Sequence, residues 1–280
     1  MMTPTSIMVR LAAGFPNDAL LKLAADFAQR FRLAKVIGVS ARQPIQIYGS
    51  ADMYVPADLI NWDCEQIGKE LRAAEKEFRA AFEGRVTSIE WRSTALSYGS
   101  IAGYVADQLR AADLLITPAL ESRTLPDRSR NPDLAELVLR AGRPVLIAGA
   151  AESRLDLGHA VVFWKDTRES RRAVDDALPL LKAADRVTVV EIAASEDLTD
   201  ARARTQDVID WLAHHGVAAA ARAEVRANEE AGQLHDIARK LEAGLIVGGA
   251  YGHTRLREWV LGGITRDVLL RPDHCSLVSH

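Results

Sequence analysis

Cysteines, aromatic residues and an excess of either charge are all scarce in this sequence. Its 280 residues include two cysteines, Cys64 and Cys275, and only 6% aromatic residues. Two cysteines so far apart do not form a disulfide framework, which favours a reducing compartment. The formal net charge of −3 provides no basic field to attract nucleic acid. We therefore expect no nucleic-acid partner.

Long hydrophobic runs and familiar enzyme motifs are also missing. No stretch approaches the roughly 18 apolar residues of a membrane-spanning helix, and residues 1–15 lack the features of a secretion signal. We expect a cytoplasmic protein with no membrane partner. The sequence contains no G-x-x-x-x-G-K-[ST] loop, G-x-S-x-G elbow or H-E-x-x-H pair. We therefore assign no catalytic residues and no protein-bound metal.

What the sequence does contain is an alternation of short apolar runs and amphipathic stretches. The apolar runs, which are typical of buried parallel strands, cover residues 7–13, 35–41, 86–91, 113–119, 144–150, 160–165, 186–193, 217–225, 244–250 and 275–280. Apolar residues recur at helical spacing in residues 17–31, 58–82, 168–184 and 201–215. This alternation predicts an α/β fold with a mostly parallel sheet and helices on both faces.

The sequence repeats itself. RAADLLITPA (110–119) resembles LEAGLIVGGA (241–250), and LVLRAGRPVLI (137–147) resembles VLLRPDHCSLV (268–278). Both pairs are offset by 131 residues, from 113 to 244 and from 140 to 271. A tandem duplication explains this offset and a length that exceeds one typical domain. We predict two domains, residues 1–150 and 151–280, each with a five-stranded sheet.

The second repeat carries a glycine cluster at Gly249, Gly252, Gly262 and Gly263. Such clusters let backbone N–H groups approach a phosphate closely, although they also form tight turns. The positions 131 residues earlier hold no glycine: they are Pro118, Glu121, Asn131 and Pro132. Since the first repeat does without these glycines, the comparison favours a phosphate-binding loop in the second half only.

The duplicated unit and its glycine motif resemble the universal stress protein family. The motif is G-x-x-G from Gly249 to Gly252, then nine residues, then Gly262-Gly263. WKDTRESRRAVDDALPLL (164–181) is similar to the first strand–helix junction of that family, and the resemblance covers essentially the whole chain. It implies a nucleotide-binding α/β fold, in which many members bind ATP or AMP at the carboxyl ends of the strands.

The resemblance also implies which residues hold the nucleotide. An aspartate after the first strand holds the nucleoside; Asp166 is the candidate, with Lys165 as a one-residue alternative. Members that bind nucleotide carry a serine or threonine hydroxyl where this chain has Gly263. Any metal would be Mg²⁺ accompanying the nucleotide. The expected binding residues are Asp166, Gly249, Gly252, His253, Arg255, Gly262, Gly263, Ile264 and Thr265.

Three functions are consistent with this resemblance. The first is a stress-response regulatory protein whose second domain binds adenine nucleotide and acts on a client protein. The second is a protein-interaction module of the same fold without nucleotide, and the third is a slow ATPase. Family members commonly dimerise through the last strand, so we expect an intrachain pseudo-dimer in which residues 144–150 and 275–280 cap each other's sheet edges. A homodimer of the whole chain is left open.

Overall fold

The computed structural model describes residues 4–44, 57–119, 129–149, 152–227, 230–250 and 274–280. Described elements of the first half are β1 (Ser6–Arg10), α1 (Asp18–Arg30), β2 (Lys35–Arg42), α2 (Ala57–Phe82), β3 (Ser88–Ala95), α3 (Ile101–Gln108), β4 (Leu114–Pro118), α5 (Leu134–Ala141) and β5 (Val145–Ala148). Those of the second half are β6 (Ala160–Phe163), α6 (Arg168–Ala183), β7 (Val187–Ala193), α7 (Leu198–His214), β8 (Ala220–Val225), α8 (Glu230–Lys240), β9 (Leu245–Gly249) and β10 (Cys275–Ser279).

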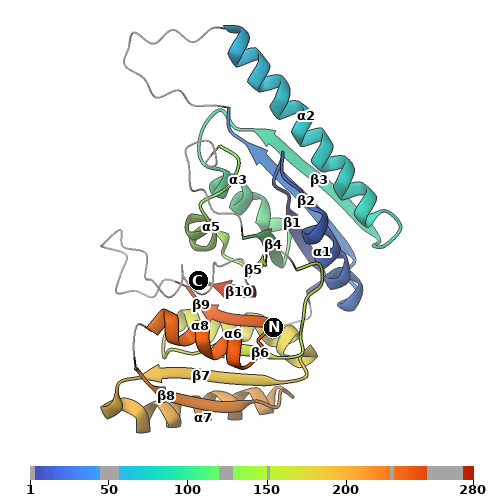
Figure 1. The fold of residues 1–280 in the computed structure, drawn as a ribbon. Helices are drawn as coiled ribbons and strands as arrows, with labels where there is room; N and C mark the ends of the chain where they lie inside the picture. The colour runs from blue at the N-terminus through green and yellow to red at the C-terminus, as the bar shows by residue number, and fades with distance from the viewer. Residues whose placement is uncertain (1–3, 45–56, 120–128, 150–151, 228–229, 251–273) are drawn as a thin grey trace, which may run out of the picture.

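The strands form one ten-stranded sheet in the order β3-β2-β1-β4-β5-β10-β9-β6-β7-β8 (Figure 1). Within each half all pairs are parallel, and the two halves have the same internal order, so β8-β7-β6-β9-β10 repeats β3-β2-β1-β4-β5. The sequence predicted two five-stranded sheets. The structure corrects that expectation in one respect, because the two sheets are joined edge to edge into one.

The joint between the halves is the antiparallel pair β5–β10. Leu277 lies opposite Leu146, Val278 opposite Val145, and Ser276 opposite Ile147. Each strand would otherwise be an exposed edge with unpaired N–H and C=O groups. Pairing them satisfies these groups within one chain, which confirms the predicted contact between residues 144–150 and 275–280.

Side chains of successive strand residues alternate between two hydrophobic cores, one on each face of the sheet. In β6, for example, Val162 belongs to the core of one face, which also holds residues of α1, α2, α6 and α7 and which we call the α6–α7 face. Its neighbour Val161 belongs to the core of the other face, which holds residues of α3, α5 and α8. The two helical layers therefore run across both halves, as expected when an antiparallel joint keeps equivalent helices on the same face.

Each of the ten apolar runs predicted as strands overlaps one strand of the sheet, although β3 extends to Ala95, four residues beyond the predicted run 86–91. The repeat is exact for the fourth strands, since β4 begins at Leu114 and β9 at Leu245, an offset of 131 residues. The Ala-rich run 217–225 forms β8, which lies at the edge of the sheet and starts at Ala220. Apolar runs were enough to locate the strands because a strand that packs in a sheet is marked by its local pattern of hydrophobic residues.

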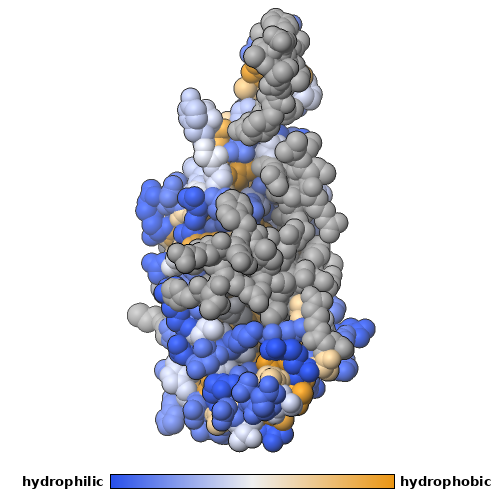
Figure 2. Space-filling model, turned by 90° about the vertical axis from the view of Figure 1, so that its left-hand side faces the viewer, coloured by the Kyte–Doolittle hydropathy of each residue, from blue (hydrophilic) through white to orange (hydrophobic). Residues whose placement is uncertain are grey.

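The surface of the described residues is largely hydrophilic on the face shown in Figure 2, where hydrophobic residues show as small separate patches. In the first half, α2 extends beyond the ends of β2 and β3 (Figure 1). No helix in the described ranges is both long enough and apolar enough to cross a membrane. The two cysteines are free thiols, Cys64 exposed and Cys275 buried.

Candidate functional site

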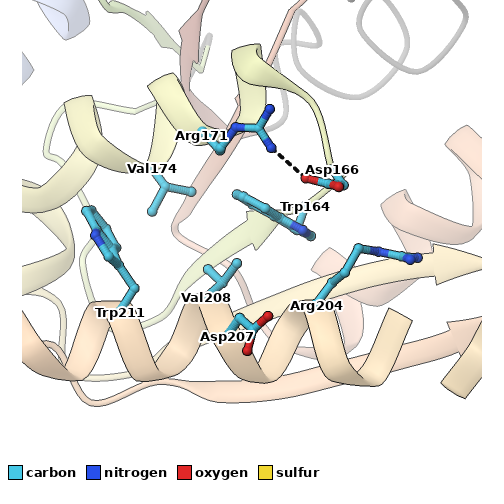
Figure 3. Close-up of a pocket in the computed structure, with 8 residues that line it drawn as sticks. All are labelled: Trp164, Asp166, Arg171, Val174, Arg204, Asp207, Val208 and Trp211. Atoms are coloured by element: carbon cyan, nitrogen blue, oxygen red, sulfur yellow. Dashed lines mark hydrogen bonds and ion pairs between the residues drawn. The ribbon is translucent and has the colours of Figure 1, made fainter. Parts of the chain in front are cut away.

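A cavity of about 410 Å³ lies between α6 and α7, where β6 ends (Figure 3). Pockets that hold small molecules typically measure about 300–1,000 Å³ and combine an apolar lining with a few polar groups. This cavity has that mixture. It is lined by Trp164, Asp166, Arg171, Val174, Arg204, Asp207, Val208 and Trp211.

Trp164 forms the floor of the cavity. Its backbone N–H donates to the carbonyl of Val190 (2.8 Å), which continues the parallel pairing one residue beyond β6. The indole packs on the α6–α7 face and is only 9% exposed. Its Nε1 is buried and has no hydrogen-bond partner among the described residues. Figure 3 shows the indole lying across the space between the two helices.

The start of α6 places two charged groups on the rim. Thr167 caps the helix by accepting a hydrogen bond from the backbone N–H of Ser170 (3.2 Å). Asp166 precedes this cap, and Arg171 donates from Nη1 to its Oδ1 (2.6 Å). Both side chains are more than half exposed. Such exposed pairs contribute about 0–1 kcal/mol, so a ligand can replace this one at little cost.

The other wall is α7. Arg204 is neutralised by the buried carboxylate of Glu191, to which it donates from Nη2 (2.5 Å) and Nε (3.0 Å). These hydrogen bonds raise the pKa of Arg204 further above its usual value. One turn on, Asp207 makes no hydrogen bond or ion pair with a described residue. Trp211 closes the far end, with its ring centroid 4.2 Å from that of His215.

Gly249, the first residue of the glycine cluster, lies against the start of α6, the helix that forms one wall of the cavity. It ends β9, the strand next to β6, with Gly248 opposite Phe163. A Cβ at position 249 would lie 2.5 Å from backbone atoms of both Glu169 and Ser170 in the first turn of α6. Glycine thus allows β9 to end directly against the start of α6.

The structure separates the two candidates after β6. Asp166 lies on the cavity rim, whereas the Nζ of Lys165 pairs with Glu230 of α8 (2.8 Å). Among the other expected binding residues, Gly249 is described as above. The rest lie outside the described residues: Gly252, His253, Arg255, Gly262, Gly263, Ile264 and Thr265.

Sequence reasoning missed the α7 wall. Arg204, Asp207 and Trp211 belong to a stretch that was identified only as an amphipathic helix. A tryptophan on its partly exposed side, one helical turn from an aspartate, was the available signal. Trp211 is 37% exposed, which is unusual for so large an apolar side chain and marks the helix as incompletely covered.

The equivalent strand end in the first half is built differently. There, α2 lies over the end of β1, and Ala13 packs with Ile67 and Leu71 of that helix. The carboxylate of Glu70 approaches Gly14 so closely that a Cβ there would lie 2.8 Å from it. Glu70 also forms an ion pair with the buried Arg42. In the first half, then, side chains from α2 occupy this position of the fold.

Metal-binding chemistry has no support in the described ranges, where no three His, Cys, Asp or Glu residues are grouped to hold an ion.

No protein-family model matches the sequence, and no curated protein matches it. Solved structures do match. A universal stress protein from Archaeoglobus fulgidus DSM 4304 superposes with a TM-score of 0.70 at 11% identity, covering 99% of this chain and 96% of that one. A universal stress protein from Pseudomonas aeruginosa UCBPP-PA14 gives 0.64 at 16% identity, with coverages of 99% and 93%.

The topology and these matches place the chain in a class of protein: duplicated α/β proteins whose two doubly wound halves share one sheet. The particular fold is that of the universal stress proteins, and the chain has it over its whole length. The identities are low, so the likeness is one of fold. A shared fold does not establish function, because one fold hosts many functions.

Proposed function

We propose that this chain is a universal stress protein-like regulatory protein whose second domain, residues 151–280, binds an adenine nucleotide, ATP or AMP. The observation that supports this most is the cavity at the carboxyl end of β6. In open α/β sheets, ligands bind where the chain leaves neighbouring strands in opposite directions. β6 and β9 form such a pair, since β6 leads to β7 on one side and β9 to β10 on the other.

In this proposal different groups around the strand ends bind different parts of the nucleotide. Asp166 accepts hydrogen bonds from the ribose, and the backbone N–H groups of Gly252, His253, Gly263 and Ile264 hold the phosphates. The start of α6 lies beside Gly249, and the positive end of the helix dipole there favours negative charge. Gly249 supports the site by letting β9 and α6 meet.

The remaining expected binding residues are assigned to the phosphates by the glycine motif. In this proposal Arg255 neutralises phosphate charge, Gly262 lets the backbone approach the phosphates closely, and Thr265 supplies a hydroxyl two positions after Gly263. Mg²⁺ would arrive with the nucleotide. The first domain, residues 1–150, is proposed to lack this loop, since the positions equivalent to its glycines are Pro118, Glu121, Asn131 and Pro132.

The proposal is tested by the melting temperature of the full chain with and without ATP or AMP, and by calorimetric titration. A ligand at 100 times its Kd that binds only the folded state stabilises it by about 2.7 kcal/mol. Gly252→Asp adds bulk and negative charge to the loop and should abolish this stabilisation. Gly232→Asp is the matched control, because Gly232 is exposed on α8 and a Cβ added there would meet no other atom within 4 Å.

Two outcomes would redirect the assignment. If neither nucleotide binds the wild-type chain at millimolar concentration, a protein-interaction module of the same fold becomes the better proposal. If nucleotide binds and phosphate is released slowly, and Gly252→Asp stops both, the chain is a weak ATPase. We also propose that the nucleotide-bound chain acts on a client protein. Candidates are proteins that the immobilised chain retains only in the presence of the nucleotide.

A further inference from the structure

We infer that the outer edge of β3 is the contact surface for a second copy of this chain. Two copies pair their β3 strands antiparallel about Trp91, which continues the ten-stranded sheet across a homodimer. This surface lies in the first half of the chain, and the inference is independent of the proposed nucleotide site.

The first observation is that β3 is an open edge. It is the outermost strand of the first half, paired with β2 on one side (Figure 1). Its residues are all half-buried or exposed, whereas every residue of β2 after the first is buried. Pairing with β2 is uninterrupted from Ser88 to Ala95, so β3 has no bulge. A regular edge of this length presents backbone groups that can pair with another strand.

The second observation is the direction of those backbone groups. The N–H of Ser88 donates to the carbonyl of Ala34 at the start of β2 (3.0 Å). The N–H and C=O of one strand residue point to the same side, and successive residues alternate. The N–H and C=O groups of Ile89, Trp91 and Ser93 therefore point away from β2. No described residue accepts a hydrogen bond from these three N–H groups.

The third observation is that the edge is complementary to itself. Antiparallel pairing about Trp91 places Trp91 opposite Trp91 of the second copy and Ile89 opposite Ser93. These are the residues whose N–H and C=O groups point outward, so each pair can exchange hydrogen bonds. The residues between them form pairs without hydrogen bonds, in which side chains lie closest. In that position Glu90 lies opposite Arg92 of the second copy, as a two-fold symmetric contact requires.

Charge selects this register among the possible ones. Within one copy Glu90 accepts a hydrogen bond from Nε of Arg92 (2.7 Å) and pairs with Lys35 (2.6 Å). Hydrogen bonds from Arg92 and Lys35 lower the pKa of Glu90 to about 2, so its carboxylate is charged at neutral pH. Pairing about Trp91 joins two such Glu–Arg pairs into an alternating arrangement. Sliding the copies by two residues either way places Glu90 opposite Glu90 or Arg92 opposite Arg92, and like charges in that position are destabilising.

The side chains favour β3 over the other outer edge of the sheet. β8 carries a comparable pair, Arg222 with Glu224, and the direction of its backbone groups would centre a symmetric contact on Ala223. Aromatic pairs across two strands contribute more than alanine pairs. Trp91 is also held in place by Phe78 of α2, with ring centroids 5.5 Å apart. We therefore assign the contact to β3.

The test measures the mass of the full chain by sedimentation equilibrium over a range of concentrations. The wild type should exchange between monomer and dimer. Glu90→Arg places two arginines opposite each other and Arg92→Glu places two glutamates, so each should raise the dimer Kd about 10- to 100-fold. An equimolar mixture of the two variants should dimerise like the wild type, because each new charge then faces an opposite one.

A backbone variant tests the contact without changing its charges. Ser93→Pro removes an outward N–H and leaves the hydrogen bonds to β2 intact, as proline at an edge strand can. It should raise the dimer Kd at least about tenfold. Ala223→Pro is the matched control, because it removes an outward N–H at the β8 edge, and it should leave the dimer Kd unchanged. This pair remains informative if Glu90→Arg folds poorly after Lys35 loses its partner.

Four results would overturn the inference. A wild-type chain that stays monomeric at the highest soluble concentration has no such contact. A dimer that Ser93→Pro leaves intact uses another surface, and a dimer that Ala223→Pro dissociates uses β8. If mixing Glu90→Arg with Arg92→Glu restores no dimer although both variants fold, Glu90 does not lie opposite Arg92 and the register about Trp91 is wrong.

Discussion

Leu277 of β10 offers a direct test of the joint between the two halves. It is fully buried, lies opposite Leu146 of β5, and belongs to the core of the α6–α7 face. Leu277→Ala removes three side-chain carbon atoms and leaves a cavity, at a cost of about 2–5 kcal/mol. For a chain of 280 residues, an unfolding entropy of about 2.1 cal/mol/K per residue gives about 0.6 kcal/mol/K. A loss of about 3 kcal/mol should then lower the melting temperature by about 5 °C.

The assay combines calorimetry with hydrogen exchange of peptides from both halves. Because the sheet is continuous across β5 and β10, Leu277→Ala should increase exchange in the first half as well as in the second. Leu146→Ala should cost a similar amount, and the double variant should depart from additivity by about 0.5–3 kcal/mol, as neighbours do. Leu212→Ala, in α7 over the far side of the second half, should combine additively with Leu146→Ala. If exchange in the first half is unchanged by Leu277→Ala, the halves are independent units and the joint carries no coupling.

Three further results are expected. Gly263→Ser adds a hydroxyl to the proposed phosphate loop and should lower the Kd for ATP, measured by calorimetric titration, about tenfold, provided that the apo melting temperature is unchanged. An unchanged Kd in a well-folded variant would indicate that these glycines serve turns and packing. Arg10 is fully buried and donates from Nε to Thr117 (2.8 Å), and burial lowers its pKa to about 9. Arg10→Met should raise the free energy of unfolding by about 1–3 kcal/mol in urea titrations, because an apolar side chain avoids the cost of desolvating the guanidinium. A loss of stability would show that the charge is needed. Burial raises the pKa of Asp176, which accepts a hydrogen bond from Ser279. The folded protein therefore holds a proton on Asp176 more tightly than the unfolded chain does, so the stability of the wild type should fall relative to that of Asp176→Asn as the pH rises above the ordinary pKa of 3.8. A constant difference in stability between the two proteins from pH 3 to 7 would contradict this.

The sequence by itself determined the strands, the duplication and the strand that joins the halves. Each depends on a local pattern: apolar runs mark buried parallel strands, and the 131-residue offset aligns β4 with β9. The joint followed from the resemblance, since a last strand left at an edge has unpaired backbone groups that the other last strand can satisfy. The glycine cluster was equally visible in the sequence, and Gly249 lies where the motif predicts, at the end of β9.

Tertiary structure alone decided which side chains share the cavity. Trp164 and Asp207 are 43 positions apart and come from different elements, so no local spacing links them. Lys165 and Asp166 are neighbours in sequence, yet Lys165 pairs with Glu230 of α8 whereas Asp166 lines the cavity, because the chain turns into α6 between them and the cavity. Arg10 reads as an interruption of an apolar run, yet its side chain is buried and bonded to Thr117 of the neighbouring strand. Hydrophobic periodicity reports whether a residue faces a core, whereas a binding site depends on which elements meet there, and that is settled only when the helices pack on the sheet.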